Sequence, residues 1–133
     1  GYVCAQYVRK NSGGGGSTGS GNRMHGFYLT GYYPDPSPME GGYLDCLGNP
    51  LATLQQYYAG QKNYCSIAVD KSVIPMKSIV NIDGFDGVKF WACDVGGAII
   101  GKHIDICVGN RQETYKVTKN GISITVYGTS PKP

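Results

Sequence analysis

Three aspartates stand beside short apolar segments of the chain, and their carboxyl groups are the first candidates for chemistry. Asp70, Asp94 and Asp105 each follow or interrupt runs of apolar and β-branched residues. A carboxylate taken out of water without a hydrogen-bond partner destabilises a fold. Three such residues in one small domain therefore predict a shared polar site.

Grouped carboxyl groups suit acid catalysis. Neighbouring carboxylates change one another's pKa, so that one of them can stay protonated and donate a proton. A glycosidic bond needs such an acid, because its leaving oxygen must accept a proton. The structural alternative is that each aspartate caps a turn. It applies best to Asp70, since residues 70–72 are typical of a turn. The Asp70 side chain can accept hydrogen bonds from the backbone N–H groups of such a turn.

The composition predicts one mainly β domain. The chain has 133 residues, enough for one core, and its 21 glycines and 11 tyrosines favour short strands with tight turns. The net charge of +3 permits weak attraction to an anionic surface such as a bacterial wall, but it does not favour nucleic acid as a partner. No apolar run approaches the roughly 20 residues of a membrane span. We also read no signal peptide, so for an exported protein we expect this sequence to be the mature form or an engineered one.

Five cysteines favour export over metal binding. They show no Cys-x-x-Cys spacing and are accompanied by only two histidines, so we expect no zinc site and no other cofactor. Disulfides in an exported protein fit better, with one thiol left over. The alternative is that several are small buried hydrophobic residues. The cysteines are Cys4, Cys46, Cys65, Cys93 and Cys107.

The chain divides into three parts. Residues 1–10 alternate as one strand, residues 11–22 have the composition of a flexible Gly/Ser linker, natural or engineered, and residues 23–130 form the domain. Within the domain a strand at 27–33 stops at three prolines, and residues 51–58 contain the single short helix. Further strands are expected at 66–69, 79–82, 89–93, 103–108, 115–117 and 123–127, with a hairpin turn at 83–87 and another at 120–121. Short strands with frequent turns predict a closed or nearly closed barrel.

Several motifs resemble the three-aspartate (3D) domain. They are Ala-Val-Asp at 68–70, Ile-Pro-Met-Lys-Ser at 74–78, Ala-Cys-Asp-Val-Gly-Gly-Ala-Ile-Ile-Gly at 92–101 and Ile-Asp at 104–105, preceded by Thr-Gly-Tyr-Tyr at 30–33. The resemblance covers residues 27–128. There are three departures: Val95 replaces a threonine, Lys77 a glycine and Cys107 a phenylalanine of the usual pattern.

The resemblance implies both a fold and an activity. The fold is a six-stranded double-psi β-barrel, here with one short helix. The activity is that of MltA-type and stationary-phase muralytic lytic transglycosylases, which cleave the MurNAc–GlcNAc β-1,4 bond without water and leave a 1,6-anhydro ring. By this resemblance Asp105 is the acid/base, and Asp94 and Asp70 support it. The substrate-binding candidates are Thr30, Tyr32, Trp91, Gly96 and Gly97.

Two other functions remain open. One is a non-catalytic glycan-binding or expansin-like wall-loosening module, which Val95 favours because it removes a hydroxyl beside the second aspartate. The other is a barrel-type endoglucanase. In each case we expect a secreted or cell-wall-associated protein, with peptidoglycan or another β-1,4 glycan as its partner; an upstream module stays open.

Overall fold

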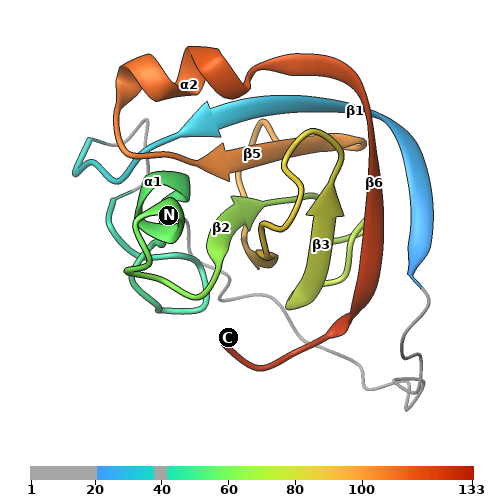
Figure 1. The fold of residues 1–133 in the computed structure, drawn as a ribbon, viewed down its shortest axis with the longest axis horizontal. Helices are drawn as coiled ribbons and strands as arrows, with labels where there is room; N and C mark the ends of the chain where they lie inside the picture. Colours follow the sequence, from blue (N-terminus) through green and yellow to red (C-terminus); the bar gives the residue numbers. More distant parts are fainter. Residues whose placement is uncertain (1–20, 38–41) are drawn as a thin grey trace.

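The computed structural model of the protein describes residues 21–37 and 42–133, which form a mainly β structure (Figure 1). The predicted strand at 1–10 and almost all of the linker at 11–22 lie outside the described residues. The elements, in chain order, are β1 (Asn22–Tyr32), α1 (Leu54–Tyr58), β2 (Cys65–Ala68), β3 (Ser78–Ile82), β4 (Phe90–Asp94), β5 (His103–Cys107), α2 (Arg111–Val117) and β6 (Lys119–Thr129).

The strands close into one barrel. Their order is β1-β5-β2-β4-β3-β6, with β6 returning to β1. The β1–β5 and β2–β4 pairs are parallel and the other pairs are antiparallel. Closure pairs every strand on both sides and removes the exposed sheet edge that invites aggregation. The predicted six-stranded double-psi barrel is confirmed.

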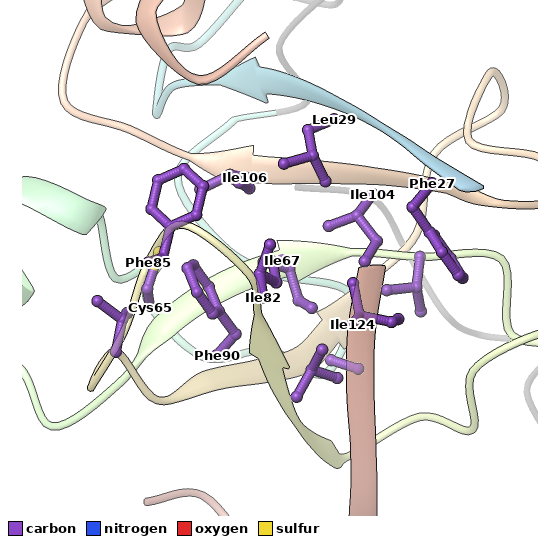
Figure 2. Packing of buried hydrophobic residues seen from close by; sticks show 14 of the residues in the cluster. Phe27, Leu29, Cys65, Ile67, Ile82, Phe85, Phe90, Ile104, Ile106 and Ile124 are labelled. Carbon is purple, nitrogen blue, oxygen red and sulfur yellow. The ribbon is translucent and has the colours of Figure 1, made fainter. Parts of the chain in front are cut away.

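Alternating residues of each strand fill the barrel. Phe27 and Leu29 of β1 lie close to Ile104 and Ile106 of β5, and all four side chains are fully buried (Figure 2). The same alternation turns Thr30 and Asp105 outward. The apolar core therefore decides which residues of β1 and β5 are available to a ligand.

Two segments differ from the sequence prediction in helix content. Helix α1 begins at Leu54 rather than at 51, because Thr53 forms a capping box with Gln56. The predicted strand at 115–117 is wrong, since these residues end helix α2. That helix starts where the Asn110 side chain accepts a hydrogen bond from the Glu113 N–H.

The predicted turn at 120–121 is also wrong. Gly121 has a φ of 68°, but it lies inside β6, which runs unbroken from Lys119 to Thr129. The pairing shifts register between Phe27–Ile122 and Leu29–Lys119. The glycine therefore forms a bulge that absorbs an extra residue instead of reversing the chain. The other strands agree with the prediction to within a few residues, and the turn at 83–87 joins β3 to β4 as expected.

Helix α2 covers β1 at Gly31. A Cβ atom at this position would lie 2.8 Å from the Thr114 Cα and 2.9 Å from the Val117 Cγ2. No side chain fits there without moving the helix backbone. The glycine of the Thr-Gly-Tyr-Tyr motif therefore lets α2 pack directly on the strand that carries Thr30.

Lys77 has a left-handed backbone, which predicts a stabilising substitution. Its φ is 72°, the only positive value among the described non-glycine residues. Its N–H donates to the Ala92 carbonyl, and its own carbonyl accepts from the Trp91 indole at 3.0 Å, so neighbouring residues hold this conformation. A side chain in this region costs about 1–2 kcal/mol. We expect Lys77→Gly to raise the free energy of unfolding by about 0.5–1 kcal/mol after the entropy cost of glycine, as measured by urea denaturation.

Lys77→Ala is the matched control. It removes the charge but keeps the Cβ atom, so we expect its stability to stay within about 0.5 kcal/mol of the parent. Equal stabilisation in both variants would show that the lysine charge, rather than the backbone conformation, is the source of the effect.

The cysteine prediction is correct only in part, because Cys46 is disulfide-bonded but three cysteines, rather than one, are free. Cys65, Cys93 and Cys107 are free thiols and fully buried, and no disulfide joins two cysteines of the described residues. Burial raises the pKa of Cys65 and of Cys93 well above the usual thiol value, which makes both poor nucleophiles. The alternative of small buried hydrophobic residues holds for these three.

Within the part of the chain that the structure describes, no helix is long and apolar enough to cross a membrane.

Candidate functional site

A row of four paired residues crosses the outer face of the barrel. Thr30 of β1 pairs with Asp105 of β5, which pairs with Ala68 of β2, which pairs with Asp94 of β4. Residues paired in this way direct their side chains to the same face. Asp105 and Asp94 thus lie on either side of a small alanine, two strand spacings or roughly 10 Å apart.

Asp105 is the more accessible of these two carboxyl groups. It is half-buried in the middle of β5. Its Oδ1 lies 2.8 Å from the Thr30 hydroxyl oxygen, which also lies 2.8 Å from His103 Nε2. The carboxyl group is therefore oriented by β1 while staying open to solvent, as a group that exchanges protons with a ligand must be.

Asp94 is fully buried and accepts hydrogen bonds from three elements. Its donors are the Tyr32 hydroxyl at 3.0 Å, the Cys46 N–H at 3.0 Å and the Val95 N–H at 3.0 Å. Burial, with the nearby Cys107 and Asp94, raises the pKa of Tyr32 well above its usual value, so the phenol stays protonated as a donor. This network joins the loop at Cys46 to β1 and to the end of β4.

An apolar group lies next to the row. It consists of buried side chains from β1, β2, β5 and two loops: Tyr32, Leu51, Ala68, Ile99 and Cys107. These side chains support the face between the two aspartates and hold Tyr32 in contact with Asp94. Cys107 is part of this packing.

Asp70 lies in a turn beyond β2 and acts there as a cap. Its Oδ1 accepts from the Ser72 N–H at 2.9 Å and the Ser72 hydroxyl at 2.7 Å, and its Oδ2 accepts from the Gly101 N–H at 2.7 Å. The Ser72 hydroxyl, followed by the Gly101 and Ser72 N–H groups, lowers the pKa of Asp70 below 3.8. A carboxyl group held in its ionised form is unsuited to donate a proton, which fits the structural alternative.

The Asp70 contacts predict a pH-dependent loss of stability. Because the pKa is lowered on folding, the stabilisation is present above pH 3.8 and is lost as the pH falls through the folded-state value. We expect Asp70→Asn to destabilise the protein more at pH 6 than at pH 2.5. Urea denaturation at both pH values measures this, and an equal difference at both would contradict it.

Three substrate-binding candidates lie in different surroundings. Trp91 is 1% exposed, and its Nε1–H donates to the carbonyls of Lys77 and Ser130, so the ring is part of the core and offers no face to a sugar. Gly96 and Gly97 are accessible in the loop after β4. Neither has a positive φ, so neither position requires glycine for a left-handed backbone.

His103 is the residue of this face whose place the sequence reasoning missed. It contacts Thr30 and lies against the Tyr28 ring, with the ring centroids 5.0 Å apart. The available signal was spacing: His103 precedes Asp105 by two residues, as Tyr28 precedes Thr30, which puts each pair on one face of its strand. His25 lies elsewhere and contacts Ser123.

No group of three or more potential metal-ligating side chains occurs in residues 21–37 and 42–133. No curated protein is significantly similar to the chain in sequence. Residues 65–127, from β2 into β6, match the 3D domain family and include all three aspartates. That family is associated with cell-wall lytic transglycosylase-like proteins. The closed six-stranded barrel, which β1 from outside the matched segment helps to close, fits a 3D domain.

Proposed function

We propose that this protein is a peptidoglycan lytic transglycosylase in which Asp105 is the acid and base. The main support is the contrast between the carboxyl groups. Asp94 is buried under three hydrogen-bond donors and Asp70 is held ionised by a turn, whereas Asp105 is half-exposed and contacts the Thr30 hydroxyl. One accessible carboxyl group is enough for this reaction, because no second carboxylate is needed to activate water.

In the proposed reaction, the Asp105 carboxyl group first donates a proton and later takes one up. The Asp105 carboxyl group donates its proton to the glycosidic oxygen as the bond from MurNAc C1 breaks, which leaves GlcNAc with a free hydroxyl. The C6 hydroxyl of the same MurNAc then attacks C1 and closes the 1,6-anhydro ring. The Asp105 carboxylate takes the C6 proton and is ready for another cycle, with no water consumed.

Thr30 and Asp94 have supporting roles in this proposal. Thr30 orients the Asp105 carboxyl group through its hydroxyl. Asp94 places a buried negative charge on the other side of Ala68, which disfavours a second negative charge on Asp105. The substrate is a cell-wall glycan, so the proposal includes a secreted or wall-associated location.

The products of purified sacculi digested in H₂¹⁸O test the reaction type. A transglycosylase releases 1,6-anhydro muropeptides without ¹⁸O, because water takes no part. Reducing-end products that contain one ¹⁸O would show hydrolysis and contradict the proposal. Binding to sacculi with no soluble product would support the non-catalytic glycan-binding module, and soluble cello-oligosaccharides from cellulose would support the endoglucanase.

A further inference from the structure

Tyr28 presents an exposed aromatic ring beside the proposed acid. It is 42% exposed and is the exposed large hydrophobic residue among the described residues of β1 and β5. Tyr28 pairs with His103 across these two parallel strands. Two residues further along both strands, Thr30 pairs with Asp105. Since residues two apart on a strand share a face, the ring and the Asp105 carboxyl group lie on the same outer face, roughly 7 Å apart along the strands.

Neighbouring groups hold the Tyr28 ring in place. The Tyr28 N–H donates to the Lys102 carbonyl at 2.9 Å, which fixes the backbone against β5. The ring lies against the His103 imidazole, with the centroids 5.0 Å apart and the planes 38° apart. His103 Nε2 in turn lies 2.8 Å from the Thr30 hydroxyl oxygen, which lies 2.8 Å from Asp105 Oδ1. The position of the ring is therefore tied to that of the acid, and an aromatic ring fixed in advance loses little entropy when a ligand binds.

A sugar ring matches this surface in its chemistry. A pyranose has an apolar face of C–H groups and an edge of polar hydroxyls, and tyrosine likewise has an apolar face and a polar tip. Ligand sites combine aromatic surface with a few placed polar groups, which Thr30 and Asp105 supply here. A singly exposed tyrosine is ordinary on a protein surface. Tyr28 differs because its ring is held by His103 on the face that carries the accessible carboxyl group.

We propose that Tyr28 is a substrate-binding residue whose ring stacks on the GlcNAc ring next to the reacting MurNAc. The inference deepens the proposed function and rests on it for the choice of sugar. In a glycan that alternates MurNAc and GlcNAc, both neighbours of the MurNAc at Asp105 are GlcNAc. Tyr28 therefore meets GlcNAc whichever way the glycan runs along β1 and β5. GlcNAc carries no stem peptide, so its C–H face is open to an aromatic ring.

NMR of the whole chain with chitohexaose, a β-1,4-linked GlcNAc oligomer, tests the contact directly. We expect nuclear Overhauser effects between the Tyr28 ring protons and the sugar C–H protons. Tyr28→Ala should raise the Kd for chitohexaose about 2–10-fold, the range of one aromatic stacking contact. Tyr28→Phe keeps the ring and should stay within about 2-fold of the parent. Where anhydro products form, Tyr28→Ala should raise KM for soluble glycan strands more than it lowers kcat, because the ring binds a sugar that does not react.

Tyr58→Ala is the matched control. It removes an exposed tyrosine from α1, a helix whose Gln55 side chain accepts from the Gly109 N–H beyond the far end of β5. This substitution should leave both the Kd for chitohexaose and KM unchanged. An equal loss of affinity in Tyr58→Ala and Tyr28→Ala would contradict a specific role for Tyr28.

Three other results would overturn the inference: no binding of chitohexaose by the parent, binding without contacts to the Tyr28 ring, or the same Kd in the parent and Tyr28→Ala. The inference and the proposed function can fail separately. If sacculi yield no anhydro product but the Tyr28 contacts and the loss of affinity are found, the proposed reaction fails and the GlcNAc site stands. If anhydro products form and Tyr28→Ala changes neither KM nor Kd, the reaction stands and the site fails.

Discussion

Asp105→Asn should reduce the release of anhydro muropeptides by about 10²–10⁴-fold, the contribution expected of a general acid. An amide has almost the same shape as the carboxyl group, and its oxygen can still accept from the Thr30 hydroxyl 2.8 Å away. It cannot supply a proton to the leaving oxygen. The folded structure should therefore persist while the chemical step is lost. Initial rates of product release, followed by mass spectrometry, measure the effect.

Asp70→Asn is the matched control, because it makes the same chemical change in another aspartate of the family-matched segment. Asp70 is occupied by Ser72 and Gly101, so its substitution should change activity by no more than a few-fold at neutral pH under conditions where the variant is folded. Equal losses in both variants would contradict the assignment of the acid to Asp105. Unchanged activity in Asp105→Asn would remove the catalytic proposal.

The fold was largely predictable from local pattern. Residues 103–107 alternate polar and apolar, and β5 shows the expected inward Ile104 and Ile106. Helix α2 was not predictable in this way. Residues 115–117 favour a strand locally, but the Asn110 cap starts a helix before them, and Gly31 leaves room for that helix on β1. Both causes depend on residues outside the segment, one of them some 80 positions away.

The site was predictable in residue type but not in role. The sequence places three aspartates beside strands, and all three then look alike. Their surroundings differ because of contacts across the chain: the Cys46 N–H reaches Asp94 from a loop, whereas the Thr30 hydroxyl reaches Asp105 from a paired strand. The register of β1 with β5 also brings His103 to Thr30, and no short motif encodes that register.

Asp94→Ala should destabilise the protein by about 3–5 kcal/mol, because it leaves several buried donors without an acceptor. The hydroxyl of Tyr32 and the N–H groups of Cys46 and Val95 all donate to this carboxylate, which is fully buried. Asp94→Asn is the matched control. Its amide oxygen can accept from both N–H groups, and its NH₂ can donate to the Tyr32 oxygen, so its loss should stay within about 1.5 kcal/mol.

Urea denaturation measures both Asp94 variants, with the fluorescence of Trp91, the single tryptophan and a buried one, as the reporter. Asp94→Asn also removes the buried negative charge that disfavours ionisation of Asp105, so it should lower the activity while the protein stays folded. Full activity in Asp94→Asn would show that the role of Asp94 is structural only. A stable Asp94→Ala would contradict the structural role, because the three donors would then have found other partners at no cost.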